Sequence, residues 1–419
     1  MSESTLDSTR TNITECRTCQ SKNLHLYLPL GDQALANSFL TKEQLEDVEA
    51  TYPLEVFYCG DCFHSQLGYT VDPDEMFRNY LWVSGTSDEI PVHFEKYADE
   101  VYERFMKDGD LVVEAASNDG TLLKAFKKYD VRILGVDPAR NIAEIAEKEN
   151  GVPTMAEYFN VENAKKIVEE HGHAAAVIAN NVFAHVDDLG GFTDAAYTIL
   201  KDDGIFTIES PHALDFLKKN EFDTVYHEHI SYLSLTALAP FFERHKMRLF
   251  DVQQTAVHGG SIRMYVSKDM SKPISESLKD LLQQEEDAGV SDPATYEQFG
   301  KNIAELKTEI VDMLTKLKKE GKTIAGYGAS AKGQTLLQYC GIGTDILEYV
   351  ADKAPLKQGR YTPGTHIPIV HTDAIKKNPT DYLFILAWNF ADEIMSQQAD
   401  YAGGGGQFIV PVPHPRIIS

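Results

Sequence analysis

The sequence is short of three things: positive charge, cysteine and long apolar runs. It has 39 Lys and Arg residues against 64 Asp and Glu residues, a formal net charge of −25. An acidic surface repels phosphate backbones, so we expect no nucleic-acid partner, although a local pocket can still bind a small anion. The sequence contains no stretch of about 20 apolar residues, so neither a transmembrane helix nor a membrane partner is expected.

The cysteines and the amino terminus indicate the compartment. Five cysteines in 419 residues do not make a disulfide scaffold. The first residues, MSESTLDSTRTN, are polar and lack the apolar stretch of a signal peptide. We therefore expect a cytoplasmic protein, with a monomer as its expected state.

The order of sequence patterns predicts an α/β protein. Residues 13–70 are loop-rich and contain the paired cysteines. Residues 71–270 begin with helical connector segments, up to about residue 110, and continue with short apolar strands that alternate with helices. These strands are LVVEAAS, VRILGVD, AAVIANNV and GIFTIESP. Such alternation is typical of a parallel sheet covered by helices.

The remaining chain predicts a second module of the same kind. Residues 271–320 have apolar residues at three- and four-residue steps and predict a surface pair of helices that links domains. Residues 321–419 then repeat the strand–helix alternation, in TIAGYGAS, ILEYVADK, DYLFILAW and GGQFIVP. We therefore predict an N-terminal metal-binding domain, a central Rossmann-like domain and a C-terminal Rossmann-like α/β domain.

Two CxxC pairs are the strongest local signal. Cys16 and Cys19 form the first pair, and Cys59 and Cys62 form the second. Four thiolates in two such pairs suit tetrahedral Zn²⁺ and leave no open coordination position, so the predicted zinc is structural. Free or redox-active thiols are the alternative. Cys340 is isolated and is predicted to lie in the core.

The segment that follows the first strand of the central module predicts a cofactor site. Small residues after a buried strand and before a helix let a ligand approach the backbone and the helix N-terminus. The next strand ends at Asp137, 17 residues after Gly120, where a carboxylate can accept both hydroxyls of a ribose. The predicted cofactor residues are Glu114, Ser117, Asn118, Asp119, Gly120, Asp137, Pro138 and Asn180.

This pattern alone does not separate NAD from S-adenosylmethionine (SAM). The acidic turn residue Asp119 favours SAM, because it would repel the pyrophosphate of NAD and attract the ammonium and sulfonium of SAM. Asn180 and Asn181, at the end of AAVIANN, are expected to face the same ligand from the carboxyl edge of the sheet.

The cluster Tyr226-His227-Glu228-His229 has three possible roles: acid–base chemistry, core packing or metal binding. In a strand, His227 and His229 would face one way and Glu228 the other. His185, in NNVFAHVDD, suits a helix cap or core packing equally well.

Two further segments could contact an anion. His258, Ser261 and Arg263, in HGGS-x-R, offer backbone N–H groups, a hydroxyl and a guanidinium, and a plain tight turn is the alternative. AGYGASAKGQTLLQY echoes VEAASNDGTLLKAF, with Lys332 at the turn where the first module has an acid. Lys332 is therefore predicted to contact the diphosphate or the nucleotide of a substrate, unless it is simply exposed to solvent.

Nine segments, in order from about residue 16 to 370, resemble the sugar C-methyltransferases that act on nucleotide-linked keto-deoxysugars. Their best-known members make C3-methyl branched sugars for antibiotics. The matching segments are LANSFL, YPLEVFYCGDCFHSQL, SNDGTLL, GVDPARNIA, NNVFAHVDD, IESPH, FDTVYHEHISYLSL, HGGSIR and GYGASAKGQTLL.

This resemblance implies a zinc-binding N-terminal domain, a central SAM domain and a C-terminal domain that helps to hold the sugar nucleotide. It implies that His229 is the general base. It also implies that the reacting sugar and the cleft are lined by Tyr226, Glu228, Tyr80, Asn181 and His185.

The chain departs from the family pattern in two places. Ala115 and Ala116 stand where a bulkier residue and glycine are expected, which bears on cofactor binding. Trp82 stands where members often have a second tyrosine, which bears on the identity of the sugar.

Two other functions use the same features. One is an NAD-dependent oxidoreductase or epimerase of sugar nucleotides, which would need the same ribose-binding carboxylate. The other is a zinc-ribbon adaptor without catalysis, for which YHEH and HGGS-x-R would have no use. The sequence does not specify the sugar, the nucleotide base, the methylated carbon or the stereochemistry.

Overall fold

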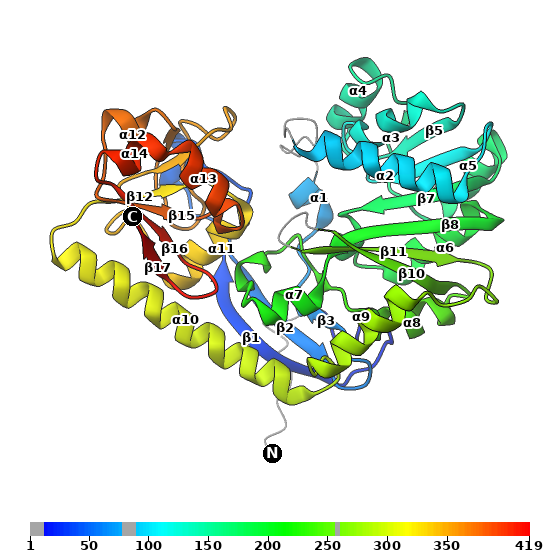
Figure 1. Cartoon of the computed structure of the whole chain (residues 1–419), viewed down its shortest axis with the longest axis horizontal. Coiled ribbons are helices and arrows are strands. Elements are labelled where there is room, and N and C mark those ends of the chain that lie inside the picture. The colour runs from blue at the N-terminus through cyan, green and yellow to red at the C-terminus, as the bar shows by residue number, and fades with distance from the viewer. Residues whose placement is uncertain (1–11, 78–88, 256–259) are drawn as a thin grey trace.

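The computed structural model describes residues 12–77, 89–255 and 260–419, and it contains three β-sheets (Figure 1). Two α/β bodies stand side by side, and the N-terminal sheet and the long helix α10 (Pro293–Lys319) run beneath them. Tyr80, Trp82 and His258 lie outside the described residues. Within the described residues, none of the helices combines the length and the apolar character that crossing a bilayer requires.

The N-terminal sheet is antiparallel and has the order β1-β2-β3-β9. Its strands are β1 (Leu24–Gln33), β2 (Tyr52–Cys59), β3 (Ser65–Leu67) and β9 (Ser231–Tyr232). The last strand comes from the central segment, so the chain just before Ser231 is attached to both parts of the molecule. Leu67 N–H also donates to the Ile230 carbonyl at 2.9 Å.

The central sheet has the order β10-β11-β8-β7-β4-β5-β6. Five strands are parallel, and the β10–β11 hairpin adds an antiparallel edge. The strands are β4 (Leu111–Ala115), β5 (Arg132–Val136), β6 (Thr154–Met155), β7 (Ala174–Asn180), β8 (Leu200–Pro211), β10 (Arg248–Thr255) and β11 (Ser261–Ser267).

Helices cover the central sheet, and the short helix α1 (Pro73–Phe77) precedes them in the chain. The later helices are α2 (Glu89–Phe105), α3 (Thr121–Ala125), α4 (Arg140–Lys148), α5 (Val161–His171), α6 (Leu189–Ile199), α7 (Ala213–Lys218) and α8 (Leu235–Arg244). The predicted connector helices correspond to α1 and α2. All four predicted strands of this module are confirmed.

The C-terminal sheet has the order β14-β13-β12-β15-β16-β17 and is parallel except for β17. Its strands are β12 (Ile324–Tyr327), β13 (Val350–Asp352), β14 (Ile369–His371), β15 (Tyr382–Ile385), β16 (Gln407–Val410) and β17 (Arg416–Ile418). Its helices are α11 (Ala331–Cys340), α12 (Ala374–Lys377), α13 (Ala391–Gln397) and α14 (Ala399–Gly403). The predicted fold class, with two Rossmann-like modules, is confirmed.

The predicted helix pair between the modules consists of α9 (Glu276–Asp287) and α10. The second helix is more than a surface connector. Its apolar stripe, which includes Tyr296, Ile303, Ile310 and Leu317, is buried in one core with residues of β1, β2 and the C-terminal sheet. The N-terminal and C-terminal sheets therefore share a hydrophobic core.

Candidate active site

A cavity of about 680 Å³ is lined by residues of all three parts of the chain. Many of the predicted site residues meet in its wall: Glu114, Ser117, Asn118, Asp137, Pro138, Asn180, Asn181, His185, Tyr226, Glu228, His229 and Lys332. The predicted residues Asp119, Gly120, Ser261 and Arg263 do not line this cavity.

The turn between β4 and α3 opens the backbone to the cavity. Ala116 and Asn118 adopt left-handed conformations, with φ of 53° and 50°. Ala116 thus adopts a left-handed conformation at the position where the family pattern has glycine. For a residue with a Cβ, this conformation costs about 1–2 kcal/mol of conformational free energy. Gly120, with φ of 75°, is needed for packing, because a Cβ there would lie 2.8 Å from the Val152 Cβ.

Asp137 is fixed at the end of β5 by two backbone donors. Its Oδ2 accepts from Asn118 N–H and its Oδ1 from Ala139 N–H, both at 2.9 Å. Burial raises the pKa of the carboxyl, and these two bonds oppose the rise. A carboxylate has about four lone-pair sites, so two remain for the paired hydroxyls of a ribose.

Glu114 is the acid of this turn that faces the cavity. Burial, together with the charges of Asp119 and Asp137, raises the pKa of Glu114 well above its usual range. Its Oε2 is buried and has no hydrogen-bond partner among the described residues. A ligand ammonium would supply the missing donor, so the site fits the aminoacyl end of SAM.

Asp119 was expected to face a cationic ligand, but its carboxylate lies at the start of α3. Its Oδ1 accepts from the hydroxyl and the N–H of Thr121, at 2.7 and 3.2 Å, at the start of α3. An acid at this point of a turn serves the helix start as readily as a ligand. Glu114, rather than Asp119, is therefore the acid of this turn that lines the cavity.

The turn that bears His229 lies between the central and N-terminal sheets. His229 Nδ1 lies 2.8 Å from the Thr224 carbonyl, and its Nε2 lies 2.7 Å from the Tyr226 hydroxyl. Since a carbonyl can only accept, Nδ1 carries the hydrogen and Nε2 has the lone pair. The neighbouring Ile230 N–H donates to the Ala184 carbonyl, which fixes the turn to the chain beyond β7.

The four residues of YHEH form a turn instead of a strand, so the predicted alternation of side chains is wrong. The reason is that β9 begins only at Ser231. His227 is buried with its Nε2 3.2 Å from the Tyr52 carbonyl, and burial lowers its pKa to about 4. Glu228 reaches the cavity and accepts from the Asn37 amide at 2.6 Å.

Two residues beyond β7 complete this wall. Asn181 has a φ of 53°, and its N–H donates to the Glu209 carbonyl at 2.8 Å. The His185 ring lies 4.9 Å from the His229 ring, centroid to centroid. Burial lowers the pKa of His185 to about 4. His185 is therefore uncharged at neutral pH and does not oppose protonation of His229.

The opposite wall comes from the C-terminal sheet and contains two ammonium groups, on Lys332 and Lys357. Lys332 Nζ lies 3.4 Å from Glu221 Oε2 and 5.4 Å from the centre of the Trp388 ring. Lys357 Nζ donates to the Ala329 carbonyl at 2.8 Å, and burial lowers its pKa. Ser330 and Ala331, at the start of α11, line the same wall.

The second module repeats the carboxylate geometry of the first. Asp352 Oδ2 accepts from Ala329 N–H at 2.6 Å and its Oδ1 from Ala354 N–H at 2.7 Å, as Asp137 does with Asn118 and Ala139. Asp352 does not line the cavity, whereas Lys357, five residues later, does. In the second module, the charged side chain of this segment that reaches the cavity is therefore Lys357.

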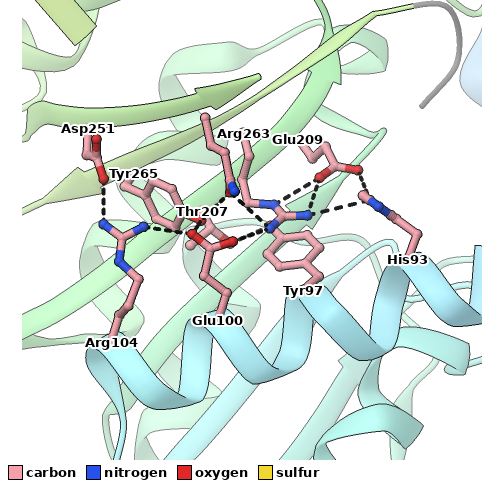
Figure 2. Close-up of polar contacts among 10 residues, drawn as sticks. His93, Tyr97, Glu100, Arg104, Thr207, Glu209, Asp251, Arg263 and Tyr265 are labelled. Atoms are coloured by element: carbon pink, nitrogen blue, oxygen red, sulfur yellow. Dashed lines mark hydrogen bonds and ion pairs between the residues drawn. The ribbon is translucent and has the colours of Figure 1, made fainter. Parts of the chain in front are cut away.

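Arg263 is not available to a ligand. Its Nε and Nη2 donate to Glu209 Oε2 at 2.9 and 2.7 Å, and its Nη1 donates to Glu100 Oε2 at 2.9 Å (Figure 2). Its guanidinium stacks 3.4 Å from the centre of the Tyr97 ring. The predicted anion or carbonyl contact of Arg263 is therefore wrong, because β8 and α2 supply acids that the local sequence does not show. Ser261 is buried at the start of β11.

The four paired cysteines form one cluster. Their sulfur atoms lie within 4.8 Å of one another, and the Cys16–Cys62 and Cys19–Cys59 pairs are each 3.6 Å apart. Tetrahedral zinc with Zn–S bonds of about 2.3 Å places two sulfurs about 3.8 Å apart, so the geometry fits Zn²⁺. With four protein ligands, the zinc is structural.

The cavity residues that were not predicted from the sequence as site residues include Asn37, His93, Glu209 and Lys357. Asn37 and Glu209 lie in LANSFL and IESPH, two of the segments that carry the family resemblance. Lys357 could have been found from the echo between Asp137 and Asp352. No sequence signal marks His93.

Comparison with known proteins gives family matches over nearly the whole chain. Family models match for a zinc-binding domain at residues 16–77, a methyltransferase domain at 93–247 and a C-methyltransferase C-terminal domain at 256–413. The C-methyltransferase NovU of Streptomyces niveus is 36% identical over 409 residues, which cover 97% of each chain.

Solved structures also align with part of the chain. Magnesium protoporphyrin IX methyltransferase from Synechocystis PCC 6803, with bound SAH, is 11% identical with a TM-score of 0.34, over 42% of this chain and 82% of that chain. A SAM-dependent methyltransferase from Archaeoglobus fulgidus is 17% identical with a TM-score of 0.32, over 43% and 74%.

Proposed function

The chain belongs to the family of SAM-dependent C-methyltransferases with an N-terminal zinc-binding domain, and we propose that its substrate is a nucleotide-linked keto-deoxysugar. The observation that supports this proposal most directly is the single cavity. An acid and a ribose-type carboxylate line one side, two ammonium groups line the other, and His229 lies in the wall with them. Neither an NAD-dependent oxidoreductase nor a zinc adaptor accounts for the family match.

The two lysines suit the diphosphate of the substrate. Lys332 follows the Ser330 cap at the start of α11, where the helix dipole adds partial positive charge. Lys357 adds a second ammonium in the same wall. The protein as a whole has a net charge of −25, so this pair is a local exception that suits an anionic substrate.

The reaction begins at a ring carbon next to the ketone. SAM, when bound, supplies an electrophilic methyl group on a sulfonium. His229 Nε2 removes the proton from the ring carbon, and the C–H electrons form an enolate with its charge on the carbonyl oxygen. With SAM bound, the same carbon would take the methyl group as the bond between that methyl and the sulfur breaks. S-adenosylhomocysteine would leave with the electron pair of that bond, the ketone would be restored, and the proton would remain on His229. Positioning and exclusion of water dominate this step, because it joins opposite charges.

Tyr226 is placed to stabilise the enolate. In the resting pair its hydroxyl donates to His229 Nε2 at 2.7 Å. Because Nε2 has a single lone pair, the hydroxyl must turn away from it before Nε2 takes the substrate proton. The hydroxyl is then free to donate to the oxygen on which charge develops. Thr224 supports the base throughout, because its carbonyl accepts from Nδ1 and stabilises the imidazolium.

The first prediction concerns Asp137, which we assign to the ribose of SAM. Asp137→Ala is expected to weaken SAM affinity by about 10- to 100-fold, the effect of losing charge-assisted hydrogen bonds. Isothermal titration of the purified variant measures it. Asp352→Ala is the matched control, because it breaks the same turn geometry away from the cavity and should leave SAM affinity unchanged. Normal SAM binding by Asp137→Ala would overturn the assignment.

The second prediction concerns Lys332. Lys332→Met is expected to raise the KM for the sugar nucleotide by about 10- to 100-fold while SAM affinity is retained. Initial-rate measurements with each ligand varied separate the two effects. Lys353→Met, in an exposed lysine outside the cavity wall, is the control. An unchanged KM would mean that Lys332 serves only its contacts with Glu221 and Trp388.

The cysteines bear on the compartment of the enzyme. A zinc site of four cysteines and a further buried free thiol, Cys340, require a reducing environment. We therefore propose that the enzyme acts in the cytoplasm.

A further inference from the structure

Helix α2 presents four residues to the central sheet on one face. His93, Tyr97, Glu100 and Arg104 follow helical spacing, and they meet side chains of β8 and β11 (Figure 2). Glu209 pairs in register with Arg263, and Thr207 pairs with Tyr265. The Tyr97 hydroxyl lies 2.7 Å from the Thr207 hydroxyl, so this is the face of the sheet that α2 covers.

The ion-paired groups at this face do not balance in charge. The carboxylates of Glu209, Glu100 and Asp251 face only two guanidiniums, those of Arg263 and Arg104. One negative charge is left over, in a place where Glu209 is fully buried. The imidazole of His93 lies beside this buried carboxylate and contacts it directly.

His93 closes the set at the cavity end. Its Nε2 lies 2.6 Å from Glu209 Oε1, and because a carboxylate oxygen only accepts, Nε2 carries a hydrogen. Burial by itself raises the pKa of Glu209, but the contacts with His93 and Arg263 outweigh burial and leave the pKa below its usual value. Glu209 therefore stays ionised. His93 Nδ1 makes no hydrogen bond to the described residues, and the ring lines the cavity. In the imidazolium, Nδ1–H is therefore a donor for a ligand anion.

Glu114 lies on the same face of the sheet as this set. It pairs in register with Ile178, and Ile178 pairs with Thr207. Paired residues on adjacent strands share a face, so the Glu114 side chain points toward α2. Two strand spacings of about 4.8 Å separate the backbone of Glu114 from that of Thr207 on β8, about 10 Å in all, and Glu209 lies two residues further along β8 on the same face. One face of the cavity thus has a carboxylate oxygen, Glu114 Oε2, without a hydrogen-bond partner among the described residues, together with the imidazole of His93.

An α-amino acid group has an ammonium and a carboxylate on the same carbon and matches this pair of groups. We propose that His93 binds the α-carboxylate of SAM while Glu114 faces its α-ammonium, and that Glu209 and Arg263 are positioning residues that hold His93. This inference rests on the SAM pocket assigned above. It also gives Arg263 a function, because the guanidinium acts on the ligand through Glu209 and His93.

The test compares two adenosine thioethers by isothermal titration of the zinc-loaded protein. S-adenosylhomocysteine has the aminoacyl group, and 5′-methylthioadenosine lacks it. His93→Gln keeps a donor near Glu209 but loses the charge and the second donor. It is expected to weaken S-adenosylhomocysteine binding by about 10- to 100-fold and to leave 5′-methylthioadenosine binding unchanged.

Variants of the ion-paired set separate positioning from general damage. Glu209→Gln should reduce the preference for S-adenosylhomocysteine in the same direction as His93→Gln. Glu100→Gln, which touches Arg263 but not His93, is the matched control and should keep the preference. The melting temperature of each variant shows whether it folds. If Glu209→Gln or Glu100→Gln fails to fold, the comparison of the two thioethers in His93→Gln still tests the proposal.

Other outcomes would overturn the proposal. One is an unchanged preference for S-adenosylhomocysteine in His93→Gln. If kcat for methyl transfer nevertheless falls in that variant, the donor acts on the reacting oxygen of the substrate instead. Equal loss of both ligands would indicate collapse of the pocket. Asp137→Ala should weaken both thioethers, and if it weakens neither, the assignment of the pocket itself fails.

Discussion

His229→Asn is expected to lower the rate of methyl transfer by about 10²- to 10⁴-fold, the usual worth of a general base. The change deletes the proton acceptor Nε2 without adding a charge, and the side-chain amide can still donate toward the Thr224 carbonyl. Binding of SAM and of the sugar nucleotide should therefore persist. Single-turnover rates and titration of each ligand measure the two properties separately.

The hydrogen-bonded pair allows a sharper control. Tyr226→Phe keeps the base but removes the donor to the enolate, so it should also lower the rate while leaving both ligands bound. Because the two groups share one hydrogen bond of 2.7 Å, the double variant should lose less than the product of the single losses. The wild-type rate should fall in acid, since only a neutral ring accepts a proton. Transfer by His229→Asn at the wild-type rate would remove His229 from the mechanism.

Loss of zinc is expected to have the largest effect on folding. Structural zinc contributes on the order of 10 kcal/mol in small zinc-binding peptides, and here it holds the cysteines that border β2. Cys59→Ser should lower the zinc content below about one ion per chain and reduce the yield of folded protein. Protein that does fold should keep its turnover, because the metal has no open position for substrate.

Cys340→Ser is the matched control for the zinc site, since this thiol is buried in the core outside the cluster. Metal analysis of purified protein and thermal unfolding with and without chelator measure the effect. Active wild-type protein without zinc would contradict the structural role. A cooperative loss of activity together with the N-terminal sheet is the expected result, because β9 joins that sheet directly after the His229 turn.

The strands and the cofactor carboxylate could be predicted because their signals are local. Short apolar runs that end in Asp137 and Asp352 need no information from elsewhere in the chain. The same applies to the CxxC pairs, whose spacing indicates the metal. In each of these cases the residues that determine the structure lie within one strand–turn–helix unit or one knuckle.

The errors arise where the partner is distant in sequence. From its local sequence, Arg263 is predicted to bind an anion. In the structure it donates instead to Glu209 and Glu100, which lie 54 and 163 residues away in the sequence. His93 has no motif of its own, and only the packing of α2 on β8 brings it to the cavity. The YHEH alternation fails for another reason. Four residues are too few to distinguish a strand from a turn.

Transfer of a ¹³C-labelled methyl group from SAM to a nucleotide-linked keto-deoxysugar tests the central claim most directly. The zinc-loaded enzyme is incubated with a panel of such sugars, and NMR locates the label. The account predicts a new carbon–carbon bond at the ring carbon next to the ketone, with loss of the proton that this carbon carried, and no product from His229→Asn. A methyl group on oxygen or nitrogen, or no transfer to any nucleotide-linked keto-sugar of the panel, would contradict it.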